Sequence, residues 1–153
     1  AATGLVKASL YHRFPGGKEE MVDAILSEVD REFREYVLRP AYEPGPPEKR
    51  AGQMARRLGE FYHSGERWCL LDTLSIAGGR KTLAHARRSM EFWIDSFARV
   101  AREAGLPRDL ARTRAEEEVA AIEGGLIISR VTKSGRQFSP ALQSLPSPLT
   151  DPR

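Results

Sequence analysis

The chain has 153 residues, an apolar fraction of 41%, and 24 Lys and Arg residues against 21 Asp and Glu residues, for a formal net charge of +3. This composition permits a hydrophobic core and excludes the disordered and fibrous classes, and the length suits one domain or a small head on a larger body. Cys69 is the only cysteine, which excludes an internal disulfide framework and any multi-cysteine metal site.

The first 18 residues carry the whole formal net charge. Their only charged side chains are Lys7, Arg13 and Lys18, and without these three the chain has 21 cations and 21 anions. A local excess of positive charge favours binding to a phosphate backbone. The alternative is that three cations in this stretch arise by chance.

Residues 6–13 are predicted to form a short helix, held by Leu5, Leu10 and Phe14 on its inner side. Small side chains on its outer side would let such a helix sit deep in a major groove, and a tyrosine hydroxyl could reach a phosphate. The outward residues are Lys7, Ala8, Ser9, Tyr11, His12 and Arg13.

A Pro-Gly-Gly break at positions 15–17 separates this helix from a long amphipathic one, which begins at Lys18. A cation in the first turn of a helix opposes the helix dipole. It is favourable when an anion sits there, because the free N–H groups and the ammonium then converge on one phosphate. The alternative is an exposed lysine without a role.

Apolar residues recur at helical spacing along most of the chain. Helices are expected over residues 18–39, ending at Pro40, and over 48–63, 81–104 and 107–133, with a short last helix carrying Phe138, Leu142 and Leu145. The apolar segment 68–77 is short enough for a strand, but its helical neighbours favour a buried helix. Three prolines after position 145 predict a disordered tail over residues 146–153.

Gly124 and Gly125 fall inside the helix expected over residues 107–133. Glycine costs up to ~1 kcal/mol relative to alanine in a helix interior. The pair is tolerable where another helix or a ligand comes very close. A kink or a break between two helices explains it equally well.

Patterns typical of enzymes are missing from the sequence. His12, His63 and His85 are far apart and lack metal-ligand spacing, and neither a G-x-S-x-G motif nor a phosphate-binding glycine loop occurs. We therefore expect no metal, no cofactor and no enzymatic activity. No apolar run approaches the ~20 residues that cross a bilayer. The chain also has no signal-peptide pattern, so we expect a cytoplasmic protein without a membrane partner.

The run T-G-L-V-K-A-S-L-Y-H-R-F-P-G-G-K-E-E-M, from Thr3 to Met21, resembles the end of the helix-turn-helix and the start of the fourth helix in TetR-family transcriptional repressors. The Pro-Gly-Gly-Lys junction is similar to that of the branch with LmrA- and YxaF-like repressors. The resemblance covers about a seventh of the chain. The family's first helix and most of its second are absent, Val6 stands where a capping serine is common, and the junction holds one extra residue.

This resemblance implies an all-α, TetR-like fold with a truncated DNA-binding head. Residues 1–39 would be the remainder of the helix-turn-helix domain with its connecting helix, and residues 46–145 the ligand-binding and dimerisation domain. Tyr11 and Lys18 would contact phosphates. Lys7, Ala8, Ser9 and His12 would lie near base edges, with Arg13 beside them.

The resemblance also implies a homodimer that binds a palindromic double-stranded DNA operator and responds to a small apolar or aromatic effector. Candidate dimer-interface residues in the last two helices are Ala121, Gly125, Ile128, Phe138 and Leu142. Candidate pocket residues are Phe61, Trp68, Leu71, Trp93, Phe97 and Ile122, for each of which an ordinary core position is the alternative. A helical small-molecule-binding or interaction module that never touches DNA is the competing hypothesis.

Overall fold

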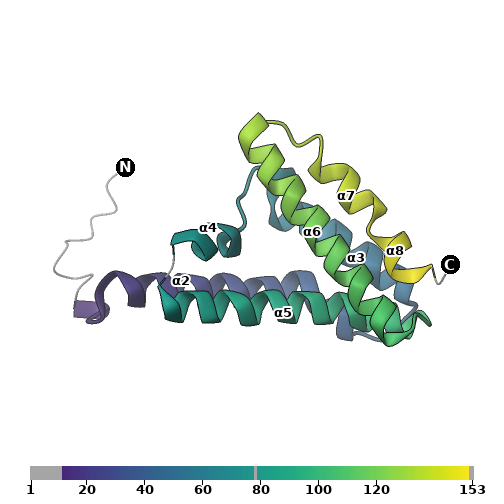
Figure 1. The fold of residues 1–153 in the computed structure, drawn as a ribbon, viewed down its shortest axis with the longest axis horizontal. Helices are drawn as coiled ribbons and strands as arrows, with labels where there is room; N and C mark the ends of the chain where they lie inside the picture. Colours follow the sequence, from purple (N-terminus) through teal and green to yellow (C-terminus); the bar gives the residue numbers. More distant parts are fainter. Residues whose placement is uncertain (1–11, 78, 152–153) are drawn as a thin grey trace.

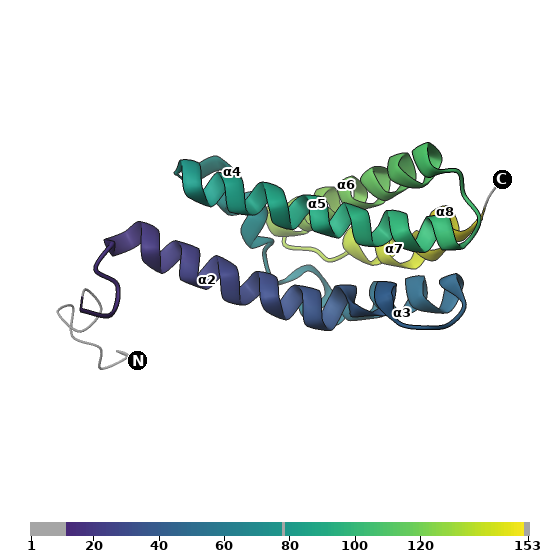
Figure 2. The same ribbon diagram turned by 90° about the horizontal axis from the view of Figure 1, so that it is seen from below.

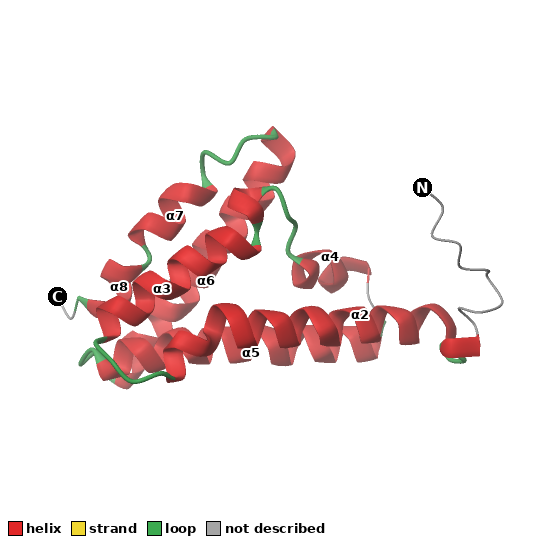
Figure 3. Ribbon diagram, turned by 180° about the vertical axis from the view of Figure 1, so that it is seen from behind, coloured by secondary structure: helices red, strands yellow, loops and turns green. Residues whose placement is uncertain are grey.

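The computed structural model describes residues 12–77 and 79–151, and these residues are all-helical, without a β-strand. This confirms the predicted all-α class (Figure 3). The chain order is α2 (Gly17–Phe33), η1 (Arg34–Leu38), η2 (Arg39–Tyr42), α3 (Pro47–Phe61), η3 (His63–Gly65), α4 (Leu70–Ala77), α5 (Arg80–Glu103), α6 (Arg108–Thr132), α7 (Phe138–Ser144) and α8 (Pro146–Thr150). Among the described residues, no helix combines the length and hydropathy needed to span a bilayer.

Helices α2 and α5 run side by side in the same direction along the long axis of the molecule (Figures 1 and 2). Helices α3, α6 and α8 pack around the second half of α5, and α7 packs on α3 and α6, whereas α4 lies over the first half of α5 (Figure 1). The start of α2 lies at the opposite end of the molecule from α8. The fold therefore consists of a helical body from which the first halves of α2 and α5 project.

The predicted ends of α3, α5 and α6 agree with the structure to within two residues, because the sequence carries clear end signals. Pro47 is the first residue of α3, and Pro107 directly precedes α6. Proline is tolerated at these positions because the N–H that it lacks has no acceptor within the helix. Gly105 follows α5 with φ +102°, and Leu106 N–H bonds back to the Ala101 carbonyl at 3.1 Å. This is the Schellman arrangement, which stops α5 and starts the turn into α6.

The first long helix does not stop at Pro40 as predicted. Its α-helical part ends at Phe33, and a wider π turn and a tighter 3-10 turn carry the chain on to Tyr42. Pro40 falls in the first turn of the 3-10 segment, where its missing N–H is tolerated. The change of helix type lets both Val37 and Leu38 point into the core, where each is at most 1% exposed.

Two other expectations need correction. Segment 68–77 does form a helix, α4, but it is not buried, because Trp68 just before it is 61% exposed and Ile76 is 83% exposed. The tail expected to be disordered forms α8 over Pro146–Thr150. Leu149 on this short helix is fully buried, and its side chain fixes the segment against the body.

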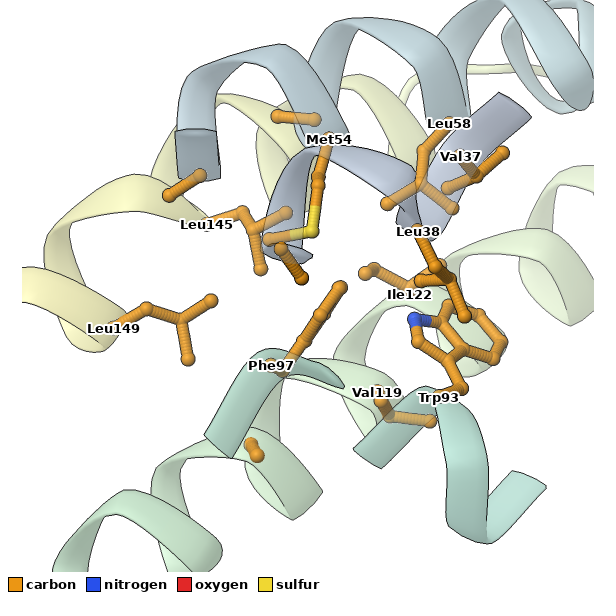
Figure 4. Packing of buried hydrophobic residues seen from close by; sticks show 14 of the residues in the cluster. Val37, Leu38, Met54, Leu58, Trp93, Phe97, Val119, Ile122, Leu145 and Leu149 are labelled. Atoms are coloured by element: carbon orange, nitrogen blue, oxygen red, sulfur yellow. The ribbon is translucent and has the colours of Figure 1, made fainter. Parts of the chain in front are cut away.

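The main core lies between α3, α5, α6 and the last two helices. Trp93 and Phe97 of α5, Met54 and Leu58 of α3, and Ile122 of α6 are all fully buried there (Figure 4). Leu145 and Leu149 close the same core from the C-terminal end (Figure 4). Burying a side chain of this size contributes roughly 1.5–3 kcal/mol relative to leaving it exposed, so this cluster dominates the stability of the body.

The two adjacent glycines leave α6 unbroken, and they have different surroundings. A Cβ at position 125 would lie 3.1 Å from the Cα of Phe138, whereas a Cβ at position 124 would meet nothing within 4 Å. Close approach of α7 therefore explains Gly125, and the alternative of a break between two helices is excluded. A side chain at position 124 would face open space.

Candidate functional site

A cavity of about 220 Å³ lies between α2, the start of α4 and the first half of α5. Its wall is mainly aliphatic and aromatic, with a few polar side chains. Cavities of this kind are the usual binding places for small molecules. The lining residues are Ile25, Leu26, Val29, Asp30, Phe33, Phe61, Tyr62, Arg67, Trp68, Cys69, Leu70, Leu71, Ser89 and Trp93.

Aromatic rings form the end of the cavity that adjoins the core. Phe33 packs edge to face on both Phe61 and Trp93, with ring centroids 5.2 Å and 4.9 Å apart. Tyr62 meets Phe61 edge to face at 5.1 Å and lies 6.2 Å from Phe33. Edge-to-face pairs add about 0.5–1.5 kcal/mol each beyond their burial, so this end of the cavity is rigid.

The opposite end of the cavity is partly open. Ile25 is 57% exposed and Trp68 is 61% exposed, so both line the cavity and face solvent. The guanidinium of Arg67 lies 4.3 Å from the Phe61 ring centroid and 3.6 Å from Glu32 on α2. Arg130 lies over the Trp68 ring at 5.8 Å. A small molecule could therefore enter beside Trp68 without unfolding the body.

A buried polar group, Glu123 on α6, stands next to this cavity. Burial raises its pKa to about 7, and the nearby Cys69 thiol offsets only part of that effect. Both carboxylate oxygens are shielded from solvent, and no N–H or O–H group of the described residues donates to either of them. Burial and the charge of Glu123 together raise the pKa of Cys69 to about 12, so this thiol stays protonated and unreactive.

Four of the six predicted pocket residues line the cavity: Phe61, Trp68, Leu71 and Trp93. Phe97 and Ile122 do not line it, and both lie in the closed core instead. The α2 wall of the cavity was missed at sequence level. Periodicity in the sequence shows an apolar stripe over residues 21–37. It does not indicate which half of this stripe faces a cavity and which half faces the core.

Most of the predicted DNA-contacting residues lie outside the described part of the chain: Lys7, Ala8, Ser9 and Tyr11. His12 and Arg13 are exposed and are separated from the Pro-Gly-Gly turn only by Phe14. Lys18 is exposed in the first turn of α2 and makes no ion pair with any described residue. The ammonium is thus available to an outside anion.

The N–H groups at the start of α2 are less available than predicted. The backbone N–H of Gly16 donates to the Glu20 carboxylate at 2.6 Å, and that of Gly17 donates to the Phe14 carbonyl at 2.9 Å. Glu20, Glu19 and Asp23 surround a hollow that they share with Lys81. The expected convergence of free amides on one phosphate is therefore wrong for these two groups, since the protein supplies their acceptors itself.

Two of the predicted dimer-interface residues lie inside the subunit. Phe138 is fully buried, and Gly125 is covered by the backbone of α7, so neither can meet a second copy. Leu142 is half-buried, with its Cδ1 against α3 beside Gly59. Ala121 and Ile128 are exposed on α6.

Ala121 and Ile128 belong to an exposed apolar stripe along α6, which we call the α6 stripe. Its members recur at intervals of one, three and four residues, which places them on one face of the helix. Ile127, Ile128 and Val131 are 38%, 45% and 74% exposed. The α6 stripe comprises Ala120, Ala121, Gly124, Ile127, Ile128 and Val131.

Comparison with known proteins adds no assignment. No protein-family model matches the chain, and no curated protein matches it. The residues themselves therefore carry any functional argument.

Proposed function

We propose that this protein is a ligand-responsive transcriptional regulator of the TetR type, acting as a repressor and binding a palindromic DNA operator as a homodimer. The observation that carries the proposal is the shared use of α2. This helix follows directly from the cationic N-terminal segment, and five of its residues form one wall of the cavity. A molecule in the cavity would therefore act on the helix that holds the DNA-contacting segment.

Each part of the proposal has its own support. The exposed Lys18 and Arg13 and the cationic residues before them supply the charge for phosphate contacts. The α6 stripe offers an apolar surface for a second copy, and two copies would present two reading heads to successive major grooves. An effector would change DNA affinity only through a different affinity for two arrangements of the heads.

Titration of the full-length protein against its own upstream DNA at low and high salt tests the DNA-binding part. Because phosphate contacts release counterions, affinity should fall steeply with salt. Lys18→Ala should weaken binding on all sequences and reduce the salt slope by about 1. Lys49→Ala is the matched control, since it removes an exposed lysine from α3 at the far end of the molecule. Absent or salt-independent binding would refute the proposal.

The second candidate function is a helical small-molecule-binding or interaction module without DNA binding. The Glu20 carboxylate that caps Gly16 favours it, together with Glu19 and Asp23 nearby, because negative charge at the junction repels phosphate. On this hypothesis Lys18→Ala and Tyr11→Phe leave the function in the cell unchanged, whereas changes in the cavity abolish it.

A further inference from the structure

One wall of the cavity holds a hydroxyl that has no partner among the described residues. Ser89 on α5 lines the cavity, is only 4% exposed, and its Oγ makes no hydrogen bond with any described residue. A helical serine can satisfy its hydroxyl by bonding to the carbonyl four residues earlier, as Ser96 does with Phe92 at 2.7 Å. A buried hydroxyl without a partner costs free energy, which a bound molecule could recover.

Asp30 on α2 stands across the cavity from Ser89. Two contacts between α5 and α2 lie on either side of Ser89 and place it opposite this part of α2. His85, one turn before Ser89, has its Nε2 4.0 Å from Asp30. Trp93, one turn after Ser89, packs on Phe33 with ring centroids 4.9 Å apart. Asp30 also lines the cavity and accepts a hydrogen bond from Arg34 Nε at 2.7 Å. A carboxylate has about four acceptor sites, so Asp30 can serve Arg34 and a ligand together.

The other polar groups of the lining have partners, point away from the cavity or lie at its opening. The Tyr62 hydroxyl and the Cys69 thiol hydrogen-bond to each other. Figure 4 shows the indole nitrogen of Trp93 turned toward the side of Ile122 in the core. Arg67 stacks on Phe61 near the exposed Trp68. The hydroxyl and the carboxylate are thus the polar pair available inside the cavity.

The chemistry of this pair selects one class of ligand. An anionic group beside Ser89 would be repelled by Asp30, and a cationic group would compete with Arg34 for a carboxylate that is already paired. A neutral hydroxyl fits both partners, because it can donate to Asp30 and accept from Ser89. The rest of the wall is apolar, and a cavity of ~150 Å³ already admits benzene in another protein.

We propose that the cavity binds a small, neutral, largely apolar ring compound with one hydroxyl group, held between Ser89 and Asp30. This inference rests on the proposed function, for which the same cavity is the effector site. It adds the polar group of the effector and the two residues that recognise it.

Binding of phenol, toluene and benzoate to the full-length protein tests the proposal. Phenol and toluene have nearly the same shape and differ in the hydroxyl, whereas benzoate adds a negative charge. Both tryptophans of the chain, Trp68 and Trp93, line the cavity, so their fluorescence reports binding directly. Excitation at the red edge of indole absorption avoids the probes. We expect phenol to bind roughly tenfold more tightly than toluene, the equivalent of one hydrogen bond, and benzoate to bind least.

The Ser89→Ala variant tests whether the Ser89 hydroxyl recognises the ligand or whether the cavity only offers room for it. The preference for phenol over toluene should disappear in this variant, while toluene binds at least as well as before, and Ser89→Thr should restore the preference. Ser96→Ala is the matched control, because it removes a buried hydroxyl from the same helix outside the cavity and should leave the preference unchanged.

Each contrary outcome has a separate meaning. Equal binding of phenol and toluene, or a preference that survives Ser89→Ala, would overturn the inference but leave the cavity as an effector site. Tighter binding of benzoate would overturn the neutral class. If none of the three probes binds, both the inference and the effector part of the proposed function fail, while DNA binding is judged by its own titration.

Discussion

Phe33 on α2 and Trp93 on α5 meet edge to face, with their ring centroids 4.9 Å apart, at the boundary between the cavity and the closed core. Phe33 is 8% exposed and Trp93 is fully buried. The pair joins α2, which follows the cationic N-terminal segment, to α5, which packs against α3, α6 and α8 of the body. Its loss would therefore affect both the stability of the fold and the shape of the cavity.

Phe33→Ala should lower the free energy of unfolding by roughly 3–5 kcal/mol, because it leaves a hole between three aromatic rings. Phe33→Leu fills most of that volume and should cost about 1.5 kcal/mol or less. Urea denaturation followed by tryptophan fluorescence measures both. In a Trp68→Phe background the signal comes from Trp93 alone, and its emission should shift to the red in the alanine variant. Equal stability of the two variants would show that the ring contacts contribute little.

Glu123 should make the protein less stable as the pH rises. Its pKa is about 7 in the folded state, above the ordinary value of 4.5, so folding favours the protonated form. The stabilising effect is complete below the unfolded pKa and is lost as the pH passes the folded one. A shift of this size corresponds to about 3 kcal/mol between about pH 4 and about pH 8. Urea denaturation across this range measures the change.

Glu123→Gln removes the titrating group and should flatten this part of the stability profile, with the largest gain above neutral pH. Glu48→Gln is the control, because it removes an exposed carboxylate from the first turn of α3. An unchanged slope in the Glu123 variant would mean that other groups carry the pH dependence, such as the buried Glu118, whose pKa burial also raises.

The α6 stripe should hold two copies together. Ile128→Asp with Val131→Asp places two charges on exposed positions, so the stability of the single subunit should change by no more than about 0.5 kcal/mol per site. The dimer should dissociate, because unpaired charges are strongly disfavoured in the centre of an interface. Sedimentation velocity over a range of concentrations measures this.

Ile76→Asp is the matched control for the dimer, since Ile76 is the most exposed large apolar residue of the described part of the chain but lies on α4, away from the α6 stripe. A variant at position 76 should sediment like the unaltered protein. If the doubly substituted protein also does so, the homodimer does not use this face.

Much of the fold is predictable because its signals are local. Helices α3, α5 and α6 have end signals in proline or glycine, and their predicted bounds differ from the structure by at most two residues. Helix α8 was missed because Pro146 and Pro148 suggest disorder. Pro146 stands in the first turn, where no N–H is needed, and burial of Leu149 secures the helix.

The site is less predictable because it depends on contacts between distant segments. Trp93 and Phe97 lie one turn apart on the same apolar face of α5, yet only Trp93 lines the cavity. Periodicity identifies the face but cannot say where α2 diverges from α5 and leaves a space. In the same way Ser89 resembles an ordinary surface serine in the sequence, and its burial without a partner follows only from the packing of α2 against α5.

Gly125 and Gly124 should respond in opposite ways to the same substitution. In a helix interior alanine is favoured over glycine by up to ~1 kcal/mol, and a Cβ at position 124 meets open space, so Gly124→Ala should stabilise the subunit. A Cβ at position 125 would lie 3.1 Å from Phe138 Cα and 3.3 Å from the Gln137 carbonyl oxygen, and these backbone atoms can move only if α7 shifts. Gly125→Ala should therefore destabilise by roughly 1–3 kcal/mol, as overpacking does. Thermal unfolding at low protein concentration measures both, and stabilisation by both substitutions would show that α7 yields freely.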